Sequence, residues 1–373
     1  MGREVKIRQS NFELMRIISM IMIVLWHIII HGHLIDNTTG VVNVFLYLLL
    51  CICIVHVNSF VLVTGYFQHD KEFSLKKFLK LFNMQWFYKV VIVLLLSFFG
   101  ILSLSKVEIL REVLPIGSFT NYWFMKCYLV LYLISPFLNK FIKSISQQEH
   151  RKCLLICFLL FSVIAYITNN AAVNNGGSTI IQFIFLYLLG AYLNKYQIKE
   201  NLHFKNYSNE KCQLIFLFGF IFFAFVNFLL LSFSIYLSNF NNQGLQTISS
   251  YIFNSRYGYS NPIVIIQTIC YFLYFETITI RSKLINAISS ATLGVYLIHD
   301  NVYVRTVIYK FLNIDQCSMN FSQCVIAIVL GTIVIFVGCL LIEGLRIVIT
   351  KFLNNRKPFI IMQNKFYAYI NKI

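Results

Sequence analysis

The segment Ser10-Asn-Phe-Glu13-Leu-Met-Arg16-Ile-Ile-Ser-Met-Ile-Met-Ile-Val-Leu-Trp-His27 decides the fold class of this chain. Its only ionisable side chains are Glu13, Arg16 and His27, and the apolar run that it opens continues to position 33. A helix needs about 20 mainly apolar residues to cross the hydrocarbon core of a bilayer. The segment therefore predicts a transmembrane helix over residues 11–33.

Nine further segments repeat this pattern along the 373 residues. Hydrophobic residues make up 58% of the sequence and charged residues 12%, whereas soluble domains have about 45–50% and about 25%. Too few charges remain to solvate a soluble enzyme, a secreted disulfide scaffold or a nucleic-acid-binding protein. We expect an all-α, polytopic integral membrane protein with about ten transmembrane helices, over residues 11–33, 41–66, 84–104, 121–145, 152–170, 179–196, 212–238, 260–281, 286–312 and 322–350.

Lys and Arg side chains gather before the first expected span and after every second one, and they give a net charge of +17. Because cytoplasmic loops are enriched in Lys and Arg, this alternation predicts an even number of spans with both termini in the cytoplasm. The excess of cations also predicts contact with anionic membrane lipids. No linker or repeat divides the chain, so we expect a single transmembrane domain over residues 1–373 without an attached soluble domain.

Arg16 and His27 are eleven residues apart, so on a helix they share one face and lie about 16 Å apart along the axis. Arg16 would lie near the cytoplasmic surface and His27 beyond the middle of the membrane. Ionisable side chains at membrane depth are costly and mark functional sites by default. The pair predicts a path for a substrate with an anionic end. Alternatively, Arg16 extends to lipid headgroups and His27 hydrogen-bonds a neighbouring helix.

Two further polar clusters lie in expected spans. In the ninth span, Tyr296 and His299 share a helical face, and Asp300 can accept a hydrogen bond from a histidine and set its tautomer. In the fourth span, Trp123 stands among aromatic residues. Both clusters also fit structural roles, as an outer-leaflet polar group and as an interfacial aromatic belt.

The sequence does not predict a metal site. His27, His31 and His33 have no acidic or thiol partner at a matching spacing, and the ten cysteines include no Cys-x-x-Cys pair. Cys317 and Cys324 flank an expected outer loop, where a disulfide between them is one alternative.

An ordered set of short blocks runs through most of the chain. It comprises Glu13-Leu-Met-Arg16 followed by His27, Thr64-Gly65-Tyr66-Phe67, Tyr122-Trp123-Phe124 with Ser135-Pro136-Phe137-Leu138-Asn139, and Gly294-Val-Tyr296-Leu-Ile-His299-Asp300. With ten spans, this set resembles the membrane acyltransferase-3 family, whose members O-acetylate bacterial surface glycans. Many members carry an Arg-x-x-Arg pair after the second span, where this chain has Lys80-Leu-Phe-Asn83 and keeps one cation.

The resemblance implies a multi-pass O-acetyltransferase of the bacterial cytoplasmic membrane. The donor would be cytoplasmic acetyl-CoA, with Arg16 and Lys80 contacting its phosphates and Lys76 and Lys77 compensating for the missing cation. The acceptor would be a sugar hydroxyl of a lipid-linked or polymeric glycan.

The resemblance also implies the roles of the remaining residues. A hydroxyl that attacks a thioester needs a base, so His27 would be the general base or a transient acetyl carrier. Trp123 and Tyr296 would line the sugar site, and His299 with Asp300 would orient the acceptor.

Two other functions share the predicted topology. A lipid-linked glycan transporter or polymerase also has many spans and a basic inner face, but the longest expected outer loop here holds only Arg256 as a cation. A small-molecule exporter would be expected to show a repeat between its halves, and this sequence shows no obvious one.

Overall fold

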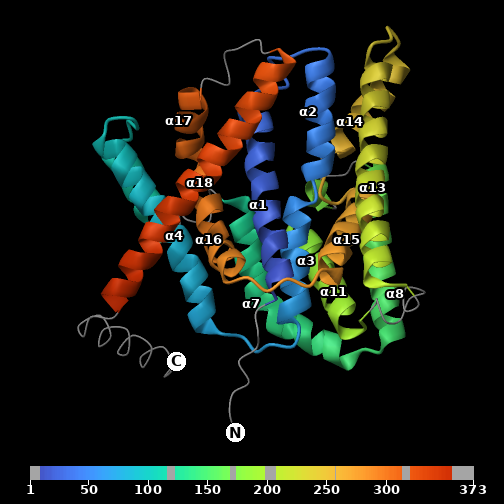
Figure 1. The fold of residues 1–373 in the computed structure, drawn as a ribbon, viewed down its shortest axis with the longest axis horizontal. Helices are drawn as coiled ribbons and strands as arrows, with labels where there is room; N and C mark the ends of the chain where they lie inside the picture. Colours follow the sequence, from blue (N-terminus) through green and yellow to red (C-terminus); the bar gives the residue numbers. More distant parts are fainter. Residues whose placement is uncertain are drawn as a thin grey trace.

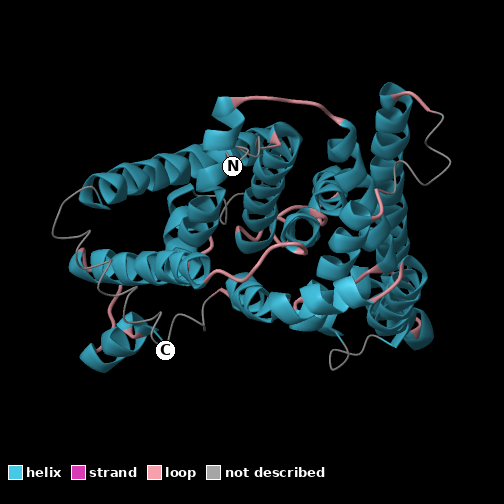
Figure 2. Ribbon diagram, turned by 90° about the horizontal axis from the view of Figure 1, so that it is seen from below, coloured by secondary structure: helices cyan, strands magenta, loops and turns pink. Residues whose placement is uncertain are grey.

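The computed structural model describes residues 9–115, 122–168, 174–197, 207–256, 258–312 and 320–354. These parts of the chain form helices and connecting loops, and no strand occurs among them (Figure 2). The prediction of an all-α fold is therefore confirmed. In chain order the main α-helices are α1 (Ser10–His31), α2 (Val41–Cys53), α3 (His56–Gln68), α4 (Leu75–Phe98), α5 (Lys106–Val113), α7 (Trp123–Ser144), α8 (Gln147–Phe158), α9 (Ala165–Thr168), α11 (Ile180–Lys195), α13 (Asn209–Ser238), α14 (Gln243–Arg256), α15 (Pro262–Thr277), α16 (Lys283–His299), α17 (Val302–Leu312) and α18 (Phe321–Asn354).

Seven of the described helical segments are long and apolar enough to cross a membrane. They are Ser10–His31, Val41–Gln68, Leu75–Phe98, Trp123–Ser144, Gln147–Thr168, Asn209–Ser238 and Phe321–Phe352. The helices α11 and α15 are apolar but have 16 residues each, and α16 has 17. The protein is thus a multi-pass membrane protein, whereas the count of ten spans and the cytoplasmic termini stay predictions.

The helix α1 packs against α2, α3, α15, α16, α17 and α18, so the segment that predicts the fold class also lies at the centre of the bundle (Figure 1). The first residues of α1 and the last residues of α18 lie toward the same end of the molecule, the lower end in Figure 1. Its neighbours bring residues from distant parts of the sequence to the face that carries Arg16 and His27.

The expected continuous span over 286–312 is wrong, because the chain breaks between α16 and α17. The Asn301 side chain accepts a hydrogen bond from the backbone N–H of Tyr303 at 3.0 Å and donates one to the Tyr122 hydroxyl at 2.9 Å. Short polar side chains that bond the local backbone compete with a continuous helix. The break leaves Asp300 buried in the protein interior.

The helix α3 is fixed against α11 by two glycines. A side-chain carbon added at Gly65 would collide with the carbonyl of Tyr187, and one added at Gly190 would collide with the carbonyl of Leu62. The two backbones can approach this closely only where a side chain is missing. This contact holds α3 in place, and α3 begins at His56 after a break from α2.

The nine cysteines that lie within the described residues form no disulfide with one another. Cys324 is one of them and is buried. Cys317 lies outside the described residues, so the pairing of these two cysteines is not tested.

Candidate active site

Two adjoining cavities lie between the helices. The first, called the histidine cavity below, has a volume of about 300 Å³ and is lined among others by Arg16, His27, His56, Trp123, Tyr296 and Asp300. The second, called the lysine cavity below, has a volume of about 950 Å³ and is lined among others by Arg16, Lys71, Lys77, Lys80 and Tyr128. The two linings share Arg16, Leu81, Tyr128, Ser290 and Leu293, so the cavities meet at Arg16.

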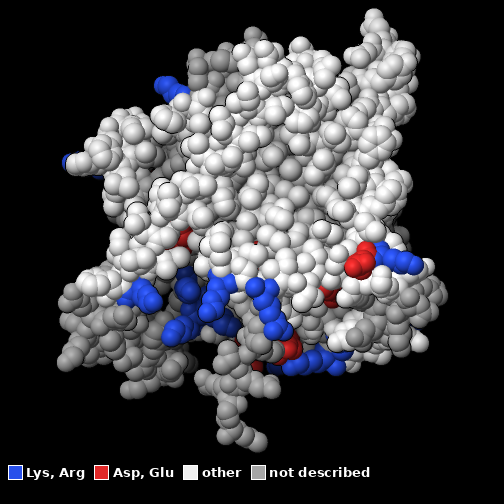
Figure 3. All heavy atoms as spheres, in the orientation of Figure 1, with Lys and Arg blue, Asp and Glu red and all other residues white. Residues whose placement is uncertain are grey.

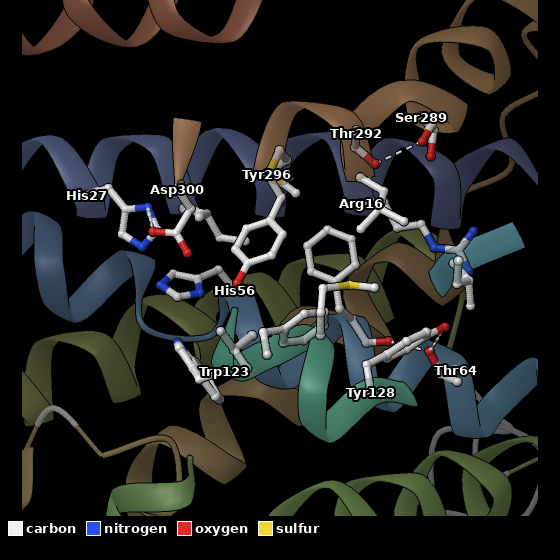
Figure 4. A pocket seen from close by; sticks show the side chains of 18 of the residues that line it. Arg16, His27, His56, Thr64, Trp123, Tyr128, Ser289, Thr292, Tyr296 and Asp300 are labelled. Carbon is white, nitrogen blue, oxygen red and sulfur yellow. Dashed lines mark hydrogen bonds and ion pairs between the residues drawn. The ribbon is translucent and has the colours of Figure 1, made fainter. Parts of the chain in front are cut away.

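Arg16 and His27 lie at opposite ends of the histidine cavity, and both extend from α1 (Figure 4). Arg16 is held at its end by Glu13, whose carboxylate lies 3.0 Å from the guanidinium nitrogen Nη1. The other carboxylate oxygen of Glu13 accepts a hydrogen bond from Ser289 of α16 at 2.5 Å. Glu13 is buried, so this ion pair orients the guanidinium at the junction of the two cavities.

His27 is oriented by hydrogen bonds with the end of α16. Its Nδ1 lies 3.1 Å from Nε2 of His299 and 3.5 Å from a carboxylate oxygen of Asp300. His299 is buried, and its own Nδ1 lies 2.6 Å from the carbonyl oxygen of Val295. Because a carbonyl only accepts, Nδ1 of His299 carries the proton, and in the neutral ring Nε2 is an acceptor. Nδ1 of His27 is therefore the donor, which leaves Nε2 of neutral His27 with a free electron pair.

Arg305 provides a positive charge beside this group. Its guanidinium Nη1 donates to Nε2 of His31 at 2.9 Å, and its Nε lies 3.6 Å from Asp300. His27, His31 and Asp300 each offer one possible metal-ligand atom, and these atoms lie within 4.8 Å of one another. The sequence spacing did not reveal this acidic partner, since Asp300 comes from a distant helix end. The guanidinium among these three residues opposes a second cation there, so we assign no metal role to them.

Aromatic side chains form the wall opposite α1. Trp123 stacks on Tyr259 with the ring centroids 5.6 Å apart and an angle of 23° between the rings. The backbone carbonyl of Tyr259 accepts hydrogen bonds from Asn58 at 2.8 Å and from Gln182 at 3.1 Å. These bonds fix the loop before α15, so the stacked pair presents a rigid flat surface to the histidine cavity.

The lysine cavity lies at the end of the bundle where α1 begins and α4 enters. Lys and Arg side chains gather at this lower end of the molecule (Figure 3). Lys77 and Lys80 of α4 line the lysine cavity together with Lys71, which precedes α4. Lys76 is exposed and lines neither cavity, so the structure does not place it with the other two lysines of the sequence prediction.

Most of the residues that the sequence singles out line one of the cavities, and His299 is the second exception after Lys76. His299 lines neither cavity and lies behind His27, which it contacts. His56, Tyr259 and Lys71 are among the lining residues that the sequence analysis missed. His56 had a visible sign of function in the sequence, because it is a histidine within an apolar span. Tyr259 had none, because it is a tyrosine in an expected loop.

The sequence profile of the acyltransferase domain of the acyltransferase-3 family matches residues 9–343, a range that contains every residue lining the two cavities. The chain belongs to the acyltransferase-3 family. Membership supports membrane acyltransferase activity and weighs against the transporter, polymerase and exporter alternatives.

No curated protein and no solved structure matches the chain.

Proposed function

We propose that this acyltransferase moves an acetyl group from cytoplasmic acetyl-CoA to a sugar hydroxyl of a bacterial exopolysaccharide, capsule or other cell-surface glycan. The observation that carries the proposal is that the lysine cavity and the histidine cavity adjoin and share Arg16 in their linings. A donor with an anionic end and a long, thin acyl arm fits such a path, because its charged end can stay among cations while its reactive end reaches His27.

The lysine cavity is suited to the phosphate groups of the donor. Lys71, Lys77 and Lys80 line it, and Arg16 lies where it adjoins the histidine cavity. Lys binds phosphate as a point charge and Arg as a planar fork. In the proposed orientation this cavity opens to the cytoplasm, where acetyl-CoA is present, so the donor enters without crossing the membrane.

His27 is the proposed general base. Its Nε2 takes the proton of the sugar hydroxyl while the hydroxyl oxygen attacks the carbonyl carbon of the thioester. A carbon–oxygen bond forms, the carbon–sulfur bond breaks, and the thiolate of CoA takes the proton back from Nε2. The products are an acetyl ester and the CoA thiol, so no proton is gained or lost. His299 and Asp300 keep Nδ1 of His27 oriented and stabilise the transient positive charge.

The acceptor sugar is proposed to bind against the Trp123–Tyr259 pair. Sugar rings have apolar faces that pack well on aromatic rings, and Tyr296 adds a further aromatic side chain to the same cavity. The fixed charges described near His27 are those of Asp300 and Arg305, which lie 3.6 Å apart and offset each other. This composition favours a neutral ring with several hydroxyls over a charged acceptor.

The proposal is tested first in cells and then with the purified protein. Surface glycan is isolated with and without the gene, and ester-linked acetate is released with alkali and measured. The purified full-length protein in lipid nanodiscs is then given radiolabelled acetyl-CoA and glycan from the deletion strain. We expect the acetate to disappear with the gene and the label to appear on the glycan. Unchanged acetate in cells, together with no label transfer from acetyl-CoA, would refute the proposal.

A further inference from the structure

The histidine cavity contains a second histidine that the proposed reaction does not use. His56 begins α3, is 1% exposed and lines the histidine cavity together with His27. Neither of its ring nitrogens has a hydrogen-bond partner among the described residues. Leaving a buried polar group unpaired costs about 1–3 kcal/mol. A cost of this kind inside a cavity points to a ligand that completes the hydrogen bonds.

Packing, and not hydrogen bonding, holds the ring of His56. The rings of Trp26 and Tyr259 contact it edge-on, with centroids 5.4 and 5.7 Å away. Its backbone carbonyl accepts a hydrogen bond from Ser59 at 2.8 Å, and the same hydroxyl lies 2.8 Å from that of Ser19 in α1. The ring is therefore fixed relative to α1, while both nitrogens stay available to a bound molecule.

The absence of internal partners matters chemically. In a neutral imidazole one nitrogen carries the proton, and a hydrogen bond to the other usually decides which. No described residue makes that choice for His56, so its proton can sit on whichever nitrogen faces the substrate. Figure 4 shows the His56 ring near His27 and Asp300 but extending from a different helix.

The reaction at His27 creates a negative charge that needs a donor. When the hydroxyl attacks, the carbonyl oxygen of the thioester becomes an oxyanion, and neutral hydrogen-bond donors aimed at it lower the barrier. The nearby carboxylate of Asp300 is paired with Arg305 at 3.6 Å, and when ionised it offers no hydrogen-bond donor to the oxyanion. The other wall near His27 is formed by the stacked rings of Trp123 and Tyr259.

We propose that His56 is the oxyanion donor of this site: its ring N–H donates a hydrogen bond to the carbonyl oxygen of the thioester as His27 removes the proton of the hydroxyl. His56 keeps its proton throughout. When the carbon–sulfur bond breaks, the electron pair on the oxygen re-forms the carbonyl of the new ester. This inference rests on the proposed acetyl transfer and adds a second catalytic residue to it.

The test uses three variants of the full-length protein in nanodiscs. His56→Leu removes the donor at similar volume, and His56→Gln keeps an N–H group. His150→Leu is the matched control, because His150 is also buried with one nitrogen, Nδ1, lacking a partner among the described residues, but it lines neither cavity. The probes are acetyl-CoA and glycan from the deletion strain, and the released CoA thiol is measured.

We expect His56→Leu to lower kcat roughly 10²–10³-fold, as the loss of an oxyanion donor does elsewhere, with both KM values changed less than about two-fold. His56→Gln should recover about ten-fold or more of this loss, and His150→Leu should match the wild type. Thermal stability should not fall in His56→Leu, because an unpartnered polar group is replaced by an apolar one.

Three results would overturn the assignment of His56 alone: a wild-type kcat in His56→Leu, no recovery in His56→Gln, or a change confined to the KM for glycan, which would make His56 an acceptor contact. If instead the wild-type protein releases no thiol from acetyl-CoA, the proposed donor is wrong, and the assignment of His56 fails with it.

Discussion

The two cavities differ in almost every physical property although they share one arginine. The lysine cavity is the larger, and its three lysines are exposed. The histidine cavity is smaller and is lined by aromatic rings and buried polar groups such as His56 and Asp300. Charge interactions are weak in water and strong at low dielectric. In the proposed function, the lysine cavity would therefore recognise the donor through several weak contacts, and the histidine cavity would perform the acetyl transfer.

Loss of His27 is the largest effect that this comparison predicts. We expect His27→Ala to lower acetyl transfer roughly 10²–10⁴-fold. Among the described residues that line the histidine cavity, His27 is the one imidazole that hydrogen bonds orient so that a ring nitrogen keeps a free electron pair. The measurement is ester-linked acetate on surface glycan, at equal amounts of membrane-inserted protein. His33→Ala is the control, since His33 is exposed and lines neither cavity. Normal acetate levels in the His27 variant would end its assignment as base.

Arg16 joins the two cavities, so its loss should be the next largest. We expect Arg16→Ala to lower kcat/KM for acetyl-CoA about 10- to 100-fold, because a hydrogen bond to a charged group contributes about 1.5–3 kcal/mol. Arg16→Lys keeps the charge but not the planar fork and should lose less. Initial rates at varied acetyl-CoA concentration provide the measurement. If the dependence on acetyl-CoA is unchanged in Arg16→Ala, the junction does not contact the donor.

The sequence predicts the residues of one helix well, because helical spacing is local. Arg16 and His27 lie on one strongly apolar segment, and the periodicity of a helix is enough to expect both on one face. The all-α fold follows from composition in the same way, and the family from the ordered blocks. These features need no knowledge of how the helices pack.

Features that depend on packing could not be predicted. His56 and Tyr259 meet at the histidine cavity although 203 positions separate them (259 − 56), and only the folded bundle brings them together. The closeness of Asp300 to His27 and His31 was missed for the same reason. The break between α16 and α17 had a visible signal in Asp300 and Asn301, two residues that favour helix ends, but the apolar residues on both sides favoured a continuous span.

The aromatic wall predicts a smaller effect, on the acceptor and not on the donor. We expect Trp123→Leu to raise the KM for glycan up to about ten-fold, because an aromatic contact contributes about 0.5–1.5 kcal/mol beyond its buried area. Trp123→Phe keeps a ring and should change this KM less. Rates at varied glycan concentration, with acetyl-CoA saturating, test it. An increase in the KM for acetyl-CoA instead would place the donor, and not the sugar, against the stacked pair.

The smallest expected effect distinguishes two adjacent lysines. Lys77 lines the lysine cavity and Lys76 does not. We expect Lys77→Ala to raise the KM for acetyl-CoA by no more than about five-fold, since exposed ion pairs contribute about 0.2–1 kcal/mol. Lys76→Ala should leave it unchanged. Because exposed charges are screened by salt, the difference between the two variants should shrink as the ionic strength rises from about 0.01 M to about 1 M. Equal effects of both substitutions at low salt would mean that the donor responds to the overall positive charge of this end of the molecule, and that the lysine cavity does not bind it at defined positions.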